Sequence, residues 1–256
     1  MPEIRIGTSG WAYANWRGRF YPAGLRPSEW LAHYATEFDT VEVNASFYRL
    51  PRPAIVRGWL ARTPEPFRFA VKAWRAITHY RRLRDCSELL SPFFATTDLF
   101  GERLGPVLFQ LPPRFPADPP LLDDFLASLP PGRRYAFEFR DTSWHRDTVY
   151  EVLRRHRAAF SSFDLAGLAA PRVATADFVY VRLHGHLRRY RGAYPEPVLR
   201  QWAEWLADCR AEGRDVWVFF DNTDEEAHAV TDARRLRALL GGMAERLGTC
   251  PGSRQF

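Results

Sequence analysis

Polar side chains end a series of short apolar segments in this sequence, and these are the residues that could do chemistry. Glu42 and Asn44 alternate with valines, so they share one face of an extended segment. The same alternation places Glu138 with Arg140 on one face. The full set is Glu42, Asn44, Lys72, Gln110, Glu138, Arg140, Asp164, Arg182, His184, Asp221 and Asn222. Burying so many charges without compensating partners would be costly, which favours one shared polar pocket.

The pocket combines carboxylates with cations. Glu42, Lys72, Glu138 and His184 are the predicted catalytic residues, with the two glutamates as acid–base candidates because neighbouring charges and burial can move a carboxyl pKa. We expect Lys72 to pair with Glu42. The predicted substrate-binding residues are Ser9, Trp11, Asn44, Tyr48, Gln110, Arg140, Trp144, Asp164, Arg182 and Asn222. Lys72, Arg140 and Arg182, with the backbone N–H groups of residues 8–10, would form an anion site.

Three functions fit these residues. The favoured one is an enzyme that acts on a small polar or anionic, sugar- or phosphate-containing, substrate by acid–base or hydrolytic chemistry. The second is metal-assisted phosphoester cleavage of nucleic acid, in which Glu42, Glu138, Asp164 and His184 would hold a divalent metal. The third is a non-catalytic binding barrel. No cofactor is predicted.

The elements that must position these residues are short strands alternating with helical segments. Strands are expected at residues 4–7, 40–44, 68–72, 107–110, 135–139, 159–163, 178–183 and 216–220. Helices are expected at 28–38, 53–62, 87–104, 120–129, 148–157, 197–212 and 224–246. The sixth connection, 165–177, is too short for a full helix. This pattern predicts an α/β fold, a single TIM-type (β/α)8 barrel over residues 1–256 with an incomplete sixth helical connection.

Composition narrows the class of protein. The 256 residues are 46% hydrophobic and carry a net charge of +6, which is a mild excess over a whole domain. Lys72 is the only lysine among 36 basic residues. Three well-separated cysteines, Cys86, Cys209 and Cys250, suit a reducing compartment. With neither a membrane-length apolar run nor a signal peptide, a cytoplasmic location is expected, whereas the oligomeric state is not predicted.

Ordered motifs along the whole chain resemble the YecE-like family, known as domain of unknown function 72. They are Gly7-Thr8-Ser9-Gly10-Trp11, Val41-Glu42-Val43-Asn44, Phe69-Ala70-Val71-Lys72, Leu108-Phe109-Gln110-Leu111-Pro112, Glu138-Phe139-Arg140, Val181-Arg182-Leu183-His184 and Phe220-Asp221-Asn222-Thr223. The resemblance implies a TIM-barrel-like fold and a bacterial or archaeal source, but no reaction. Where the family commonly has asparagine, this chain has Asp221.

Overall fold

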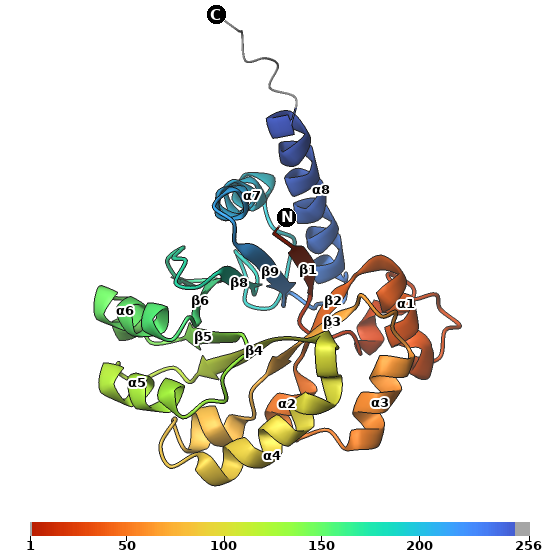
Figure 1. Cartoon of the computed structure of the whole chain (residues 1–256). Helices are drawn as coiled ribbons and strands as arrows, with labels where there is room; N and C mark the ends of the chain where they lie inside the picture. The colour runs from red at the N-terminus through yellow and green to blue at the C-terminus, as the bar shows by residue number, and fades with distance from the viewer. Residues whose placement is uncertain (1, 249–256) are drawn as a thin grey trace, which may run out of the picture.

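Eight parallel strands form a nearly closed barrel in the computed structural model, which describes residues 2–248 (Figure 1). Their order is β1-β9-β8-β6-β5-β4-β3-β2, and a bridge between Ser9 and Glu42 brings β1 against β2. The strands are β1 (Ile4–Thr8), β2 (Thr40–Val43), β3 (Arg68–Lys72), β4 (Leu104–Leu111), β5 (Tyr135–Phe139), β6 (Ala159–Leu165), β8 (Phe178–Leu183) and β9 (Asp215–Phe220). The predicted α/β barrel is therefore confirmed.

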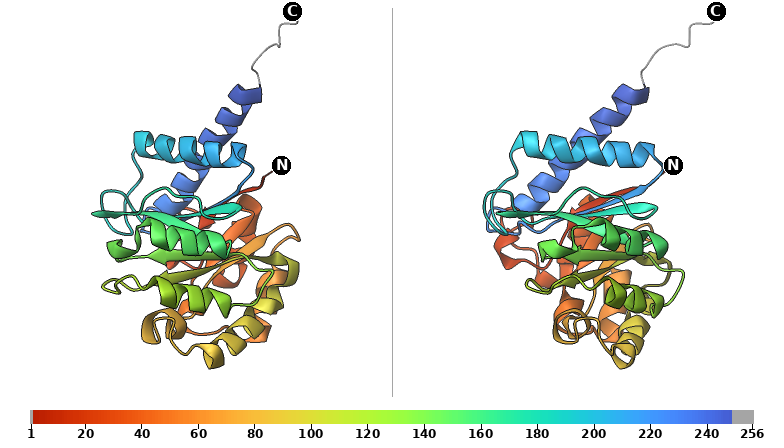
Figure 2. Two further views of the ribbon diagram at one scale, coloured as in Figure 1. Left: turned by 60° about the vertical axis from the view of Figure 1, so that its left-hand side comes forward. Right: turned by 90° about the vertical axis from the view of Figure 1, so that its left-hand side faces the viewer.

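Helices connect most successive strands and lie outside the barrel (Figure 2). They are α1 (Trp30–Glu37), α2 (Ala45–Tyr48), α3 (Pro53–Ala61), α4 (Ser87–Thr97), α5 (Pro119–Ala127), α6 (Asp147–Arg155), α7 (Glu196–Ala211) and α8 (His228–Gly248). Local sequence fixes where they begin: Pro119 starts α5, and the Asp118 carboxylate accepts a hydrogen bond from the Leu121 N–H at 3.1 Å. None of the helices within residues 2–248 is long and apolar enough to cross a membrane.

The sixth connection has no helix in the described chain between β6 and β8, as predicted. A two-residue strand, β7 (Leu168–Ala169), folds back antiparallel on β6 instead. The outer layer of helices is therefore incomplete at this point.

Several expected boundaries are wrong by a few residues. The expected helix 87–104 stops at Thr97, and a kinked 3-10 segment with Gly101 at φ 55° leads into β4, which starts at Leu104 rather than Val107. The last helix begins at His228 rather than Asp224, because Ala227 has a left-handed φ of 55° that interrupts the turn before it.

The barrel interior is filled unevenly. Inward-facing alanines on β3, β5 and β6 oppose large aromatic side chains on β8 and β9, so small and large residues complement each other across the axis. This buried cluster contains Ala70, Leu108, Ala136, Ala159, Phe178, Tyr180, Trp217 and Phe219. It closes the centre of the barrel below the strand ends that carry the polar residues.

Two junctions in the barrel wall are thin. β5 and β6 are in register over two residue pairs, whereas β8 and β9 are in register over six. β1 and β2 meet through the single Ser9–Glu42 bridge and the hydrogen bond from the Gly10 N–H to the Glu42 carbonyl at 2.8 Å. These junctions divide the wall into a first arc, β2 to β5, and a second arc, β6, β8, β9 and β1.

Candidate active site

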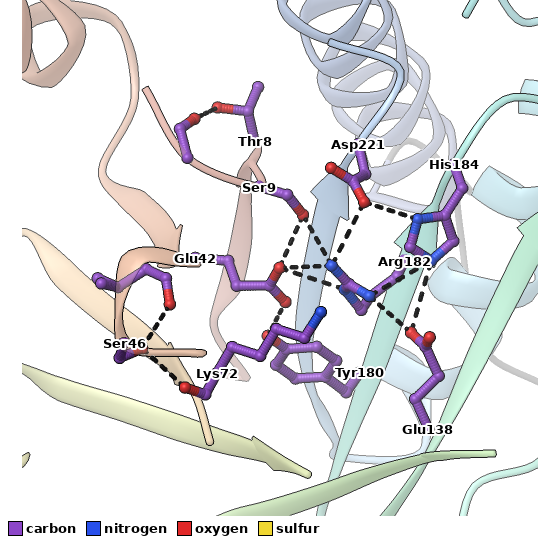
Figure 3. A network of polar contacts seen from close by, with 12 residues as sticks. Thr8, Ser9, Glu42, Ser46, Lys72, Glu138, Tyr180, Arg182, His184 and Asp221 are labelled. Atoms are coloured by element: carbon purple, nitrogen blue, oxygen red, sulfur yellow. Dashed lines mark hydrogen bonds and ion pairs between the residues drawn. The ribbon is translucent and has the colours of Figure 1, made fainter. Parts of the chain in front are cut away.

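Arg182 is the centre of a buried ionic network at the carboxyl ends of the strands (Figure 3). Its Nη2 lies 2.8 Å from Glu42 Oε1, and its Nη1 lies 3.0 Å from Glu138 Oε2. Ser9 Oγ donates to Glu42 Oε1 at 2.8 Å, and the Tyr180 hydroxyl donates to Glu42 Oε2 at 2.6 Å. Both glutamate side chains and Arg182 are 0–1% exposed, so these charges depend on one another for compensation.

His184 extends the network toward the barrel mouth. Its Nδ1 lies 2.8 Å from Asp221 Oδ2, and its Nε2 lies 2.9 Å from Arg140 Nη2. Because a guanidinium only donates, Nε2 accepts this bond, and Nδ1 is the ring nitrogen that donates to Asp221. Arg140 also donates from Nε to Glu138.

The electrostatics favour the ionised forms of two carboxylates in the network, Glu138 and Asp221. Burial alone would raise the pKa of Glu138, but the Arg140 and Arg182 guanidiniums outweigh burial and keep this pKa well below its usual range. Burial also opposes ionisation of Asp221, yet the hydrogen bond from His184 lowers its pKa. Glu138 is therefore a poor proton donor near neutral pH, contrary to its expected use as a general acid.

Lys72 lies beside this network without an ion-pair partner. Its Nζ lies 4.3 Å from the centre of the Phe47 ring, and no carboxylate among the side chains of residues 2–243 lies within ion-pairing distance of it. The expected Lys72–Glu42 pair is therefore wrong, because Arg182 reaches across from β8 and occupies Glu42. Burial and the charge of Arg182 lower the pKa of Lys72 to about 8, although the surrounding carboxylates partly offset them.

Three predicted site residues are held outside the network by contacts of their own. Asp164 follows the inward-facing Phe163, so it points away from the barrel axis, where its Oδ2 lies 2.8 Å from His186 Nδ1. Asn222 is fully buried behind the strand end and donates to Gly192 O and Asp232 Oδ2, both at 2.9 Å.

Trp144 is the third of these residues. It is 0% exposed, stacks on Phe139 at 4.6 Å and donates to the Phe115 carbonyl at 2.6 Å. All three therefore stabilise the surroundings of the mouth rather than line it.

The remaining predicted binding residues lie around the rim. Asn44 directly follows β2, and its Oδ1 is buried without a hydrogen-bond partner among the described residues. Gln110 donates to the Leu111 carbonyl at 2.7 Å. Trp11 is partly buried against Trp59. Tyr48 is 63% exposed.

The expected anion site at residues 8–10 is not formed by the backbone. The Thr8 N–H donates to the Tyr34 hydroxyl at 2.9 Å. The N–H groups of Ser9 and Gly10 each donate to a carbonyl oxygen of a neighbouring strand at 2.8 Å. All three donors are therefore used within the protein, and Arg182 is enclosed by carboxylates.

A divalent metal site is also not assembled from the predicted ligands. Asp164 lies on the other side of its strand from Glu42 and Glu138, whose oxygens already bind Arg182. Among the side chains that the structure describes, residues 2–243, no group of three or more His, Cys, Asp or Glu side chains is arranged to hold a metal ion. Cys86 and Cys209 are free and buried, and Cys250 lies outside the described residues.

Two features of the site escaped sequence reasoning. Tyr180, which binds Glu42, was detectable because it lies two residues before Arg182 and so shares its face. The π-helix Ala76–Tyr80 after β3 was not detectable from periodicity. It places His79 against Phe47 at 4.9 Å, and burial together with the charge of Lys72 lowers the pKa of His79 to about 4.

Comparisons with known proteins agree on one family. A family model described as "Protein of unknown function DUF72" matches residues 5–255. UPF0759 protein YunF of Bacillus subtilis is 26% identical, covering 93% of this chain and 94% of that protein. UPF0759 protein YecE of Escherichia coli is 35% identical over 54% of this chain, and the match spans about half (48%) of its own length.

Solved structures agree with the fold. A DUF72 family protein from Thermotoga maritima has a TM-score of 0.84 and 29% identity, covering 93% of this chain and 99% of that one. A DUF72 family protein from Enterococcus faecalis has a TM-score of 0.77 at 18% identity, covering 93% of this chain and 95% of that one.

Proposed function

This chain belongs to the DUF72 family of proteins of unknown function, and we propose that it is an enzyme that uses Lys72 for acid–base chemistry on a small polar substrate. The substrate would carry an anionic or carbonyl oxygen and would bind at the barrel mouth, where TIM-barrel enzymes place their active sites. Lys72 would exchange the proton, and the network around Arg182 would hold the charges around it in place.

The observation that carries this proposal is the unpaired ammonium of Lys72. A surface lysine remains protonated because it is solvated, and a structural buried lysine pairs with a carboxylate. Lys72 is only partly exposed and has no carboxylate partner among the described side chains; its Nζ rests on the Phe47 ring, and its pKa is lowered to about 8. A group that titrates near the working pH is the most effective proton carrier.

The other charged residues then divide into two roles. Glu42 and Glu138 are committed to Arg182, so they serve as fixed counter-charges rather than as the mobile acid and base. Arg140 and Asp221 are less enclosed, with side chains 10% and 16% exposed, and are better placed to meet substrate. The proposed acid–base role therefore moves from the two glutamates, which the sequence favoured for it, to Lys72.

The test follows the titration of Lys72 directly. Carbon-13 labelled lysine gives one side-chain signal in this protein, because the chain has one lysine. We expect a pKa near 8 for that signal, against about 10.4 for a free lysine. Conversion of a panel of sugar phosphates and small carboxylates should then be lost in Lys72→Met and kept in Arg19→Met, a surface control. A lysine signal that titrates at the free value would overturn the proposal.

Nucleic-acid binding is a second candidate because of an exposed aromatic and cationic surface beside the mouth. The Arg75 guanidinium lies between two tyrosine rings, 5.5 Å from the centre of Tyr48 and 5.4 Å from that of Tyr80. The two rings are 63% and 67% exposed, and exposed aromatic rings with nearby cations suit stacking on single-stranded bases. Fluorescence anisotropy with a labelled single-stranded oligonucleotide tests this candidate. Binding that is unchanged in Tyr48→Ala/Tyr80→Ala would refute it.

A further inference from the structure

We infer that Lys72 is a nucleophile that forms an imine with the carbonyl group of a small aldehyde or ketone. This inference rests on the proposed function and names its substrate class. Three features of the described residues carry it: the surroundings of the amine, an unpartnered oxygen on the residue beside Lys72 at the end of the neighbouring strand, and the charge balance of the network.

The first feature is the environment of the Lys72 amine. Imine formation needs an unprotonated amine that can approach a carbonyl carbon, and an ion-paired lysine offers neither. The Lys72 Nζ has an aromatic ring on one side and no carboxylate partner among the described residues. Lys72 is partly exposed, at the end of β3, so a ligand in the mouth can reach it. Burial also lowers the pKa of the Lys72 amine, which favours its unprotonated form.

The second feature is the buried Oδ1 atom of Asn44. Val43 and Val71 are paired in register, and Asn44 and Lys72 are the residues that follow them, so the two lie side by side at the ends of β2 and β3. The Asn44 Oδ1 has no hydrogen-bond partner among the described residues, although a buried polar atom normally has one. A hydroxyl group that forms on the substrate next to Lys72 would supply the missing donor.

The third feature is charge. The carboxylates of Glu42, Glu138 and Asp221 face the cations of Arg140 and Arg182, so the network is balanced when Lys72 carries one positive charge. A neutral amine leaves one negative charge in excess. A protonated imine restores the positive charge at the same nitrogen, so the network stabilises the product of the step more than its reactive precursor.

The step itself balances as follows. The Lys72 ammonium first gives up one proton. The neutral nitrogen then bonds to the carbonyl carbon, the carbonyl π pair moves to oxygen, and a second proton passes from the nitrogen to that oxygen to give a neutral carbinolamine. The C–O bond then breaks and water leaves after the first proton reaches that oxygen. The remaining C=N bond keeps its proton. In sum, a carbonyl compound and a lysine ammonium give a protonated imine and water, with no oxidant or reductant.

Trapping with sodium cyanoborohydride tests the inference, because reduction converts the imine to a stable secondary amine. The probes are dihydroxyacetone, pyruvate and dihydroxyacetone phosphate, which share a carbonyl group but are neutral, a carboxylate and a phosphate. Free Nα-acetyl-lysine in the same tube is the reference amine. At pH 7 an amine of pKa 8 is unprotonated roughly 200 times more often than one of pKa 10.4. We expect at least one probe to modify Lys72 more than tenfold faster than the reference.

Peptide mapping and variants locate the adduct. The chain has one lysine, so Lys72 and the α-amino group are the only amines that can react. Lys72→Arg keeps the charge and should lose the internal adduct while the α-amino adduct persists; Lys72→Gln serves if the arginine variant is unstable. If none of the three probes modifies Lys72 faster than Nα-acetyl-lysine, the proposed imine is refuted. If Lys72 nevertheless titrates near 8, acid–base catalysis by the same residue survives; if it titrates near 10.4, both proposals fail.

Discussion

Replacing Arg182 with methionine should destabilise the protein strongly. The substitution keeps a long apolar side chain but removes the guanidinium that lies 2.8 Å from Glu42 and 3.0 Å from Glu138. Both carboxylates are fully buried, so neither regains water when Arg182 is lost. Glu138 keeps its bond from Arg140, whereas Glu42 keeps only the hydroxyl groups of Ser9 and Tyr180. Breaking a buried ion pair by removing one partner costs about 3–5 kcal/mol.

The magnitude can be checked by urea unfolding at pH 7 and by calorimetry. For a chain of this size, 1 kcal/mol shifts the melting temperature by about 2–4 °C, so Arg182→Met should lower it by roughly 6–20 °C. The matched control is Arg19→Met, which breaks a 3.0 Å pair with Glu226 whose two side chains are 56% and 55% exposed. Exposed pairs contribute about 0–1 kcal/mol.

A double variant separates charge from packing. Adding Glu42→Gln to Arg182→Met removes one stranded charge, so the double variant should lose less stability than the sum of the two single variants. Residues within one network show interaction energies of about 0.5–3 kcal/mol. If Arg182→Met costs no more than Arg19→Met, or if the two changes simply add, the network is hydrated and the reasoning about uncompensated burial fails.

Three further predictions concern stability. Gly7→Ala should destabilise the barrel, because its new Cβ would lie 2.3 Å from the Thr40 carbonyl oxygen. Gly24→Ala is the control and should leave stability unchanged, because its Cβ would lie in open space. Equal urea midpoints for the two variants would contradict the prediction. The folded pKa of Glu138 lies below its unfolded value, so the stability it contributes is present above about pH 4.3 and is lost as the pH falls through the folded pKa. Unfolding free energies from pH 7 to 3 should therefore fall less steeply in Glu138→Gln. The folded pKa of Lys72, about 8, lies below the unfolded value, so stability should rise between pH 8 and 10.4. Lys72→Met should remove that rise, and its free energy of unfolding at pH 7 should be at least that of the wild type. A clear loss of stability at pH 7 would mean that the Lys72 ammonium forms a stabilising ion pair.

The sequence was sufficient to identify much of the barrel mouth because side chains alternate along a strand. Glu42, Glu138 and Arg182 were assigned to one face by their alternation with apolar neighbours, and they are in contact. Asp164 and Asn222 were wrongly expected to face the barrel axis, because the inward-facing position at each of these strand ends lies one residue earlier in the chain. The inward positions at those two strand ends belong to Phe163 and Asp221.

Pairing inside the barrel could not be predicted from alternation. The partner of Glu42 depends on how far each long side chain reaches across the axis, and Arg182 on β8 reaches it while Lys72 on the adjacent β3 does not. The π-helix after Lys72 and the burial of Trp144 likewise depend on packing between distant segments. Their roles in function remain predictions.

Arg182 connects the two arcs of the barrel wall next to both thin junctions. It stands on the second arc, and both glutamates that hold it, Glu42 on β2 and Glu138 on β5, stand on the first arc at its two ends. One side chain therefore braces both places where the wall is thin. Opening of the wall at either junction would strain the ion pairs of Arg182, and protonation of either glutamate would weaken them. The same charged side chains therefore influence the pKa of Lys72 and hold the two arcs of the barrel together.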